Sequence, residues 1–399
     1  MIFSVLSTAS DPKVAFEIGN FTVQWYAVFI VTGMLLGLLY ACWQAKKVGL
    51  TSDDVVELFL WLIPLAIVFA RILYVLPRWN LYFGGSGTIG DKLLKAIAIW
   101  EGGITIIGGL VGGLLGAVFF TLRHKKQTNY LNVIDLVVVP VFIGQIIGRW
   151  GNFVNQEAFG LPITDPKLQF FPFGVLIEKQ YCSGVDSDSP FYHLVYDHID
   201  AGGGANWFCA TFFYEGVWNT IGALICVAMW RKDYQKKYPG ILMLFYLFWY
   251  CIGRFWLEFL RMDAVPVTKP ACLAVALVAL AIGIVYVIAR NSQLAYRRVR
   301  GLVQTGAMSG AILTDYEVHN YKLVGKFFEK ANANSEKVGD KISAFFNRLV
   351  VNCVYSRKEQ KEYLPVDWDT LEYYHVPNDY KRKFNQFKKE DVYCAERNA

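Results

Sequence analysis

Long apolar runs constrain what this chain can fold into more than any other feature of its sequence. A helix of about 20 apolar residues is long enough to cross the hydrocarbon core of a bilayer. We expect seven such spans, at residues 22–43, 55–76, 104–122, 133–147, 217–230, 241–260 and 271–289. Because 55% of the 399 residues are hydrophobic, the composition also argues against an ordinary soluble protein. The sequence therefore predicts an all-α polytopic membrane protein.

The segments that flank these spans differ in charge. One set is short and rich in cations, namely Lys46, Lys47, Arg123, Lys125, Lys126, Arg231, Lys232, Lys236, Lys237, Arg290, Arg297, Arg298 and Arg300. The other set includes residues 161–208, a long acidic connection that we interpret as a small extracytoplasmic cap. Since short cytoplasmic loops are enriched in Lys and Arg, we expect the N-terminus outside and the C-terminus in the cytosol.

The composition also divides the chain into two predicted domains. Residues 1–290 form a seven-span membrane domain, and residues 291–399 form a charged cytosolic tail. Within the tail, apolar residues recur at helical spacing at Val338, Ile342, Phe345, Phe346, Leu349, Val350 and Cys353. An amphipathic helix on the membrane surface or docked on a partner would explain this pattern, and packing within the tail would explain it equally well.

The sequence indicates neither a cofactor nor a metal. It contains no glycine-rich phosphate loop, and its five His and eight Cys residues form no ligand cluster. The cysteines also lack the spacing of a disulfide framework. We therefore expect a protein that works within the lipid bilayer without a cofactor, a metal or a nucleic-acid partner.

A polar segment, GRWGNFVNQEAFG at residues 148–160, directly follows the fourth apolar run. One interpretation is that Arg149 simply extends to the membrane interface, as long basic side chains do. That role would require neither the neighbouring polar side chains Asn152, Asn155, Gln156 and Glu157 nor glycines that let the backbone approach a ligand. We therefore favour an anion-binding site at this end of the span.

The sixth span carries a second polar group. Tyr250, Arg254, Glu258 and Arg261 are spaced to lie on one face of a helix. Glu258 is within helical reach of both arginines, which favours structural salt bridges. One carboxylate cannot neutralise two guanidinium groups, however, and unpaired charge in hydrocarbon is costly. We therefore expect surplus positive charge here, available to an anion.

Polar residues from six spans fall at one predicted depth, toward the outer face. They are Tyr26, Arg71, Glu101, Arg149, Tyr214, Glu215 and Arg254. Guanidinium groups suit phosphate oxygens, so a phospholipid headgroup is the expected ligand, although a helix-packing salt bridge would explain Arg71 equally well. A transporter with an anion path is the second hypothesis. The apolar inner halves of the spans and the lack of a clear repeat count against it.

The pattern G-R-x-G-N-F-x-N-x-E-x-x-G at residues 148–160 is similar to the signature of the bacterial prolipoprotein diacylglyceryltransferases, and the resemblance extends over roughly residues 16–290. It implies an enzyme that moves the diacylglyceryl group of phosphatidylglycerol to the lipobox cysteine thiol of a prolipoprotein and releases glycerol phosphate. This is the first step of bacterial lipoprotein maturation. The resemblance places the protein in the bacterial cytoplasmic membrane, with its active site toward the outer leaflet.

The resemblance also implies site residues. Tyr26 lies in a Trp-Tyr pair similar to one in the family's first span, and Arg254 begins the similar run RFWLEFLR. As catalytic candidates we take Arg149, Arg254, Tyr26, Glu157 and Glu258. As substrate-binding candidates we take Asn152, Asn155, Gly160, Arg261, Glu101, Gly108, Gly109, Tyr250 and Arg71.

Two positions depart from the family pattern. Ile107 precedes Gly108–Gly109 where many members carry a histidine, and Cys209–Ala210 replace a His-Pro pair. Because Ile107 cannot accept a proton, a mechanism with histidine as general base does not transfer. Glu157, Glu258 or Tyr26 would serve as base, or the arginines alone would lower the thiol pKa, which we rank first. A family member that binds lipid without turnover is a further alternative.

Overall fold

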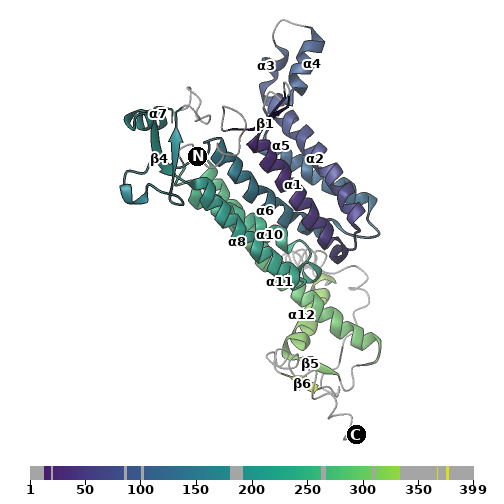
Figure 1. Cartoon of the computed structure of the whole chain (residues 1–399). Helices are drawn as coiled ribbons and strands as arrows, with labels where there is room; N and C mark the ends of the chain where they lie inside the picture. Colours follow the sequence, from purple (N-terminus) through teal and green to yellow (C-terminus); the bar gives the residue numbers. More distant parts are fainter. Residues whose placement is uncertain are drawn as a thin grey trace, which may run out of the picture. The chain divides into compact units, whose positions relative to one another are not determined.

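The computed structural model describes residues 13–18, 21–84, 88–99, 103–179, 192–261, 267–307, 311–332, 366 and 374–376. These residues belong to two compact units, Met1–Gly283 and Ile284–Ala399. The first unit is built from apolar helices with small two-stranded sheets at its loops (Figure 1).

Seven apolar helices correspond to the seven predicted apolar runs. They are α1 (Trp25–Gln44), α2 (Ser52–Val75), α5 (Ile106–Arg123), α6 (Tyr130–Val154), α8 (Thr211–Arg231), α10 (Ile241–Leu257) and α11 (Thr268–Gln304). Within the described residues, five of them (α1, α2, α6, α8 and α11) are long and apolar enough to cross a membrane, whereas α5 and α10 are shorter. The chain is therefore a mostly helical, multi-pass membrane protein, as the sequence predicts.

Glycines allow two pairs of these helices to pack closely. A Cβ atom on Gly33 or Gly37 of α1 would lie 3.1–3.2 Å from atoms of Gly144 or Pro140 on α6. On α5, a Cβ atom at Gly112 would lie 2.1 Å from a backbone oxygen of α2. Small residues are the usual means by which membrane helices approach each other, since lipid provides no hydrophobic drive for their association. The pairs α1–α6 and α2–α5 therefore form the framework of the bundle.

Tryptophans join α8 to α10. The indole N–H of Trp218 donates to the backbone oxygen of Trp249, and the indole of Trp249 donates to the backbone oxygen of Trp218, each at 2.9 Å. The two rings stack with their centroids 4.4 Å apart, and Gly222 and Gly253 leave room for them. This reciprocal pair satisfies both half-buried indoles and fixes the register of the two helices.

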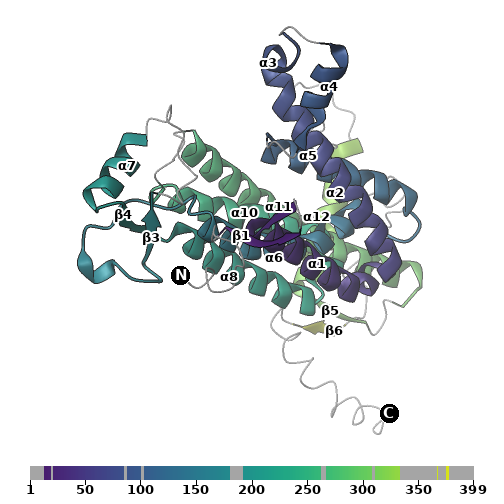
Figure 2. The ribbon, with the colours of Figure 1, turned by 45° about the horizontal axis from the view of Figure 1, so that its top comes forward.

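Short elements cover one end of the bundle. Strands β1 (Val14–Ile18) and β2 (Phe21–Gln24) form an antiparallel hairpin that leads into α1. Strands β3 (Gly174–Glu178) and β4 (Ala205–Cys209) pair antiparallel, with α7 (Tyr192–Ala201) packed beside them. Helix α2 continues through η2 (Leu76–Arg78) into α3 (Trp79–Phe83), and α4 (Ile89–Ile97) returns beside it (Figure 2). The pair α3–α4 is not an apolar span and was not predicted from the sequence.

The second unit contains the remaining described elements. Helix α12 (Asp315–Asn332) follows strand β5 (Ile312–Thr314), which pairs in parallel with β6 (Tyr374–Val376). The buried Glu317 carboxylate accepts from the backbone and side chain of Thr314, and it also pairs with Arg298. The predicted amphipathic helix at residues 338–353 lies outside the described residues.

A single carboxylate joins α6 to the start of α10. Asp135 is fully buried and accepts hydrogen bonds from the backbone nitrogens of Gly240 at 2.7 Å, Leu242 at 3.1 Å and Met243 at 3.1 Å. The first N–H groups of a helix have no partner within it, and a carboxylate there also favours the positive end of the helix dipole. Asp135 therefore acts as an N-terminal cap supplied by a neighbouring helix.

We expect Asp135→Leu to lower the free energy of unfolding by about 2–4 kcal/mol, because it leaves these N–H groups buried and unpaired. Asp135→Asn keeps one acceptor oxygen and should cost less. Thermal unfolding of purified protein in detergent measures both. Equal stability of the leucine variant and the wild type would show that α10 begins without this cap.

Candidate active site

Arg149, Glu215 and Arg254 meet at one end of the bundle. Arg149 lies in the last turns of α6, Glu215 in the first turns of α8 and Arg254 in the last turn of α10. Glu215 Oε1 lies 2.6 Å from Arg149 Nη2, and Glu215 Oε2 lies 3.3 Å from Arg254 Nη1. One carboxylate thus holds guanidinium groups from two other helices.

Glu258 completes this group. It follows the last residue of α10, and its Oε2 lies 3.1 Å from Arg254 Nη2. We call Arg149, Glu215, Arg254 and Glu258 the arginine cluster. Its two arginine side chains are 21% and 16% exposed, whereas its carboxylates are 5% and 2% exposed. The carboxylates are therefore enclosed, and the guanidinium groups face the remaining opening.

The charges of the arginine cluster balance. Two guanidinium groups pair with two carboxylates, so the surplus positive charge expected from α10 alone is not found within this cluster of described residues. Glu215 was noted in the sequence for its depth but was not included among the candidate site residues. The sequence shows only a glutamate beside an apolar run, and its partners lie on other helices.

Each arginine keeps hydrogen-bonding capacity. Arg149 donates to Asn152 and Glu215, and Arg254 donates to Glu215 and Glu258. A guanidinium group carries further N–H donors beyond these, and none of them bonds another residue that the structure describes. The cluster can therefore bind an oxyanion without losing its ion pairs.

The segment after Arg149 forms a tight polar turn. Asn152 accepts from Arg149 Nη1 at 3.2 Å and donates to Glu157 Oε1 at 2.8 Å, and Asn155 donates to the same oxygen at 3.4 Å. Gln156 and Ala158 have positive φ values of 49° and 54°, which reverse the chain after α6. These left-handed residues bring Glu157 back beside Asn152, so the turn orients the Glu157 carboxylate.

Gly151 and Gly160 place neighbouring segments against this turn. A Cβ atom on Gly151 would lie 2.5 Å from the Tyr26 ring, so the first turn of α1 packs directly on α6. A Cβ atom on Gly160 would lie 2.6 Å from the Leu260 oxygen, and Gly160 forms a β-bridge with Arg261. Both close approaches require glycine.

Arg261 reaches the site by a different route from the one predicted. Helix α10 ends at Leu257, before the expected residue 260, so Arg261 does not continue the helical stripe. It lies instead beside Gly160 through the β-bridge. Tyr250 is one turn before Arg254 on α10. The structure thus places Tyr250 on the helix that carries Arg254, and places the backbone of Arg261 beside the turn that follows Arg149.

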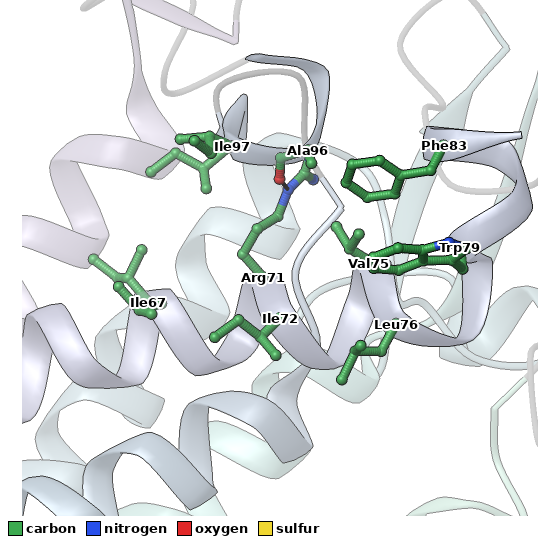
Figure 3. A pocket seen from close by; sticks show the side chains of 11 residues that line it. Ile67, Arg71, Ile72, Val75, Leu76, Trp79, Phe83, Ala96 and Ile97 are labelled. Atoms are coloured by element: carbon green, nitrogen blue, oxygen red, sulfur yellow. Dashed lines mark hydrogen bonds between the residues drawn. The ribbon is translucent and has the colours of Figure 1, made fainter. Parts of the chain in front are cut away.

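Arg71 is separate from the arginine cluster. Its Nε donates to the Ala96 oxygen at 2.7 Å, its Nη1 to Gly103 at 2.8 Å and its Nη2 to Lys95 at 2.8 Å. Figure 3 shows the side chain extending from α2 toward Ala96 along an apolar pocket of about 430 Å³. Arg71 therefore caps the C-terminal end of α4. These three partners are backbone carbonyls.

The other candidates lie on or near α5. Gly108 packs on α2, since its added Cβ would be 2.3 Å from the Phe69 oxygen. Gly109 lines an apolar pocket of about 350 Å³ between α1, α2, α5 and α6. Ile107, which replaces the family's histidine, is 71% exposed. Glu101 lies outside the described residues.

Cys209 occupies the other position at which the sequence departs from the family pattern. It ends β4, and its backbone oxygen accepts from the nitrogen of Gly160 at 2.9 Å. Burial raises the pKa of the Cys209 thiol above its ordinary value. The thiol therefore stays protonated near neutral pH and is a poor nucleophile.

A lateral gap leads to Arg149. A cavity of about 110 Å³ lies between α6 and α8 and is lined by Arg149 together with aromatic and apolar side chains, namely Ile146, Trp150, Phe212, Phe213, Gly216, Val217 and the methyl-bearing Thr220. An apolar lining with a cation at its end suits an amphipathic ligand. The gap is small, so a lipid would have to widen it.

The sequence was compared with known proteins. Residues 13–289 match the family described as prolipoprotein diacylglyceryl transferase. A protein of Streptococcus uberis is 35% identical over 285 residues, which cover 71% of this chain and 96% of that protein. A protein of Halalkalibacterium halodurans is 34% identical over 251 residues, covering 63% and 76% respectively. Both relatives are named phosphatidylglycerol–prolipoprotein diacylglyceryl transferase.

We expect Arg71→Met to lower the melting temperature, because two backbone carbonyls at the end of α4 and that of Gly103 lose their donor. Lipid phosphate binding by the folded fraction should stay within about twofold of wild type, since none of these bonds reaches the arginine cluster. Thermal unfolding and phospholipid titration measure the two effects. A large loss of lipid affinity without loss of stability would make Arg71 a headgroup ligand after all.

Proposed function

This chain belongs to the prolipoprotein diacylglyceryl transferase family, and on that basis we propose that it transfers the diacylglyceryl group of phosphatidylglycerol to the cysteine thiol of a prolipoprotein. The reaction releases glycerol phosphate and is the first step of lipoprotein maturation. The observation that carries this proposal is the arginine cluster, in which guanidinium groups from α6 and α10 share Glu215 beside a lateral gap.

We further propose that the protein spans the bacterial cytoplasmic membrane seven times, with the cluster in the outer leaflet. Helices α5 and α10 are shorter than the other five, but both are apolar, and we count them as the two remaining spans. The cations concentrated after α1, α5 and α8 support an inward orientation of those ends. The cap with β3, β4 and α7 then lies outside the cell, and residues 291–399 lie in the cytosol.

Arg149 and Arg254 are proposed to bind the lipid phosphate. Their unused N–H donors suit the two non-bridging oxygens of a phosphodiester, and guanidinium groups bind such oxygens in a forked geometry. We propose that the glycerol headgroup is contacted by residues near these arginines in the chain or in the fold, namely Asn152, Asn155, Gly160, Tyr250 and Arg261. The diacylglyceryl chains would leave through the gap between α6 and α8.

The chemical step exchanges one bond at a glyceryl carbon. The thiolate sulfur attacks the carbon bonded to the phosphate ester oxygen, so an S–C bond forms as the C–O bond breaks. The electron pair stays on the departing oxygen, and negative charge grows on glycerol phosphate. Fixed guanidinium groups stabilise that charge more in the transition state than in the ground state, which accelerates the step.

The thiol must lose its proton before it attacks. A free thiol has a pKa near about 8.5, and nearby cations lower it. We propose that Arg149 and Arg254 supply most of this effect, because Ile107 offers no base and Glu258 is enclosed beside Arg254. Glu157 is the alternative acceptor, since it lies in the turn beside Asn152 and only one of its oxygens is bonded by described residues.

The function is tested with purified protein in liposomes of phosphatidylglycerol and a lipobox peptide. We expect the peptide to gain the mass of diacylglycerol while glycerol phosphate is released. Arg149→Ala or Arg254→Ala should lower the rate at least about 100-fold, since each removes a phosphate donor. The rate of Arg149→Lys should lie between those of the wild type and Arg149→Ala, because lysine keeps the positive charge but lacks the forked pair of N–H donors.

Arg123→Ala is the matched control. The Arg123 guanidinium lies at the C-terminal end of α5, where it pairs with Glu57 and not with the arginine cluster. The rate of this variant should equal that of the wild type. Lipid binding without any product from wild-type protein would instead identify a family member that has lost turnover at Ile107.

A second test separates the two routes for the proton. We expect Glu157→Gln to lower the rate but to keep the wild-type pH profile between pH 6 and 9, because the arginines still promote thiol ionisation. If Glu157 is the base, the rate of the variant will instead rise toward that of the wild type as the pH approaches the pKa of the free thiol, because the thiol then ionises without a base.

A further inference from the structure

A second polar layer lies beneath the arginine cluster, one helical turn toward the middle of the bundle. Gln145 precedes Arg149 by four residues on α6, Asn219 follows Glu215 by four residues on α8, and Tyr250 precedes Arg254 by four on α10. Residues four apart share a helix face. All three side chains therefore lie on the faces that carry the arginine cluster.

Contacts above and below place these residues at one level. On the outer side, Glu215 contacts Arg149 and Arg254. On the inner side, a Cβ atom on Gly222 would lie 2.9 Å from the Phe142 ring and 2.5 Å from the Trp249 ring. Asn219 lies between Glu215 and Gly222 on α8. It is therefore level with the part of α6 that contains Gln145.

Asn219 is enclosed but has unused hydrogen-bonding groups. Its side chain is 0% exposed, and neither Nδ2 nor Oδ1 has a hydrogen-bond partner among the residues that the structure describes. Gln145 donates from Nε2 to the Tyr246 hydroxyl at 2.8 Å, but its Oε1 is likewise buried without a described partner. Buried amides nearly always find partners, since leaving one unpaired costs free energy.

We propose that an ordered water molecule binds between Asn219 and Gln145. Water both accepts and donates, so it matches the Nδ2 donor of Asn219 and the Oε1 acceptor of Gln145 at the same time. Two buried amides at one level, with complementary free atoms, are the kind of polar site that retains water within a protein. A helix contact without water would be expected to carry apolar side chains at these two positions rather than amides.

This water links the helices that carry the arginine cluster. It joins α8 to α6, and the hydrogen bond from Gln145 to Tyr246 continues the link to α10. Asn219 is thus a structural residue, one turn below Glu215 on α8. The inference does not depend on the proposed transfer reaction.

The sign of one stability change tests the proposal. Leucine has nearly the shape of asparagine, so Asn219→Leu removes the amide without opening a large cavity. If water binds, the variant expels it and leaves Gln145 unpaired, and the melting temperature should fall by roughly 2–6 °C. If Asn219 has no partner, the same change removes an unpaired buried amide without breaking a hydrogen bond, and the melting temperature should rise. Such a rise would overturn the proposal.

A nearly isosteric pair covers the case in which the leucine variant fails to fold. Asn219→Thr keeps a hydroxyl that can bond water, whereas Asn219→Val does not, so the threonine variant should melt higher. Thr121→Val is the control, because among the described residues the Thr121 hydroxyl bonds the Ala117 oxygen, one turn earlier on α5, and no other group. Its effect should be much smaller than the difference between the Asn219 variants. Equal melting temperatures for the Asn219 pair would count against the water.

A double-mutant cycle and a density map complete the test. Replacing Gln145 with leucine should cost less in the Asn219→Leu background than in the wild type, because both residues share one water. Additive effects would contradict the link. A structure at a resolution that shows waters should have density within about 3.2 Å of Asn219 Nδ2 and Gln145 Oε1, and clear side-chain density with no such peak would overturn the proposal.

Discussion

The site depends on one carboxylate that two guanidinium groups share. Glu215 is nearly enclosed, and removing such a charge from water is expensive unless its partners are well placed. Arg149 and Arg254 meet that requirement only when the ends of α6, α8 and α10 come together. The fold and the site are therefore coupled: whatever fixes the register of these three helices also fixes the distance between the two arginines.

The register is set by contacts outside the cluster. Asp135 caps the start of α10 from α6, and the reciprocal indole bonds of Trp218 and Trp249 hold α10 to α8. The glycines of α1 and α5 let their partners approach at backbone distance. These interactions are satisfied buried polar groups and close packing, which are the main sources of specificity where lipid provides no hydrophobic drive.

The sequence predicted the features that depend on local pattern. Each predicted apolar run became a helix, and Arg149 and Arg254 meet as expected. What depends on three-dimensional neighbours was missed. Glu215 could not be paired without knowing that α8 packs against both α6 and α10. Arg71 could not be assigned to carbonyls without α4, which is too short to be an apolar span. Arg261 was misplaced because α10 ends a turn early.

The balanced charge of the cluster has a consequence for turnover. A phosphodiester carries a single negative charge, whereas the monoester that leaves carries between one and two at neutral pH. A site with surplus cations would hold this product more tightly than the lipid and would stall. Because Glu215 and Glu258 already neutralise Arg149 and Arg254, the departing anion meets two carboxylates in its own binding site. The two carboxylates therefore favour dissociation of glycerol phosphate, and they are in place before any substrate binds.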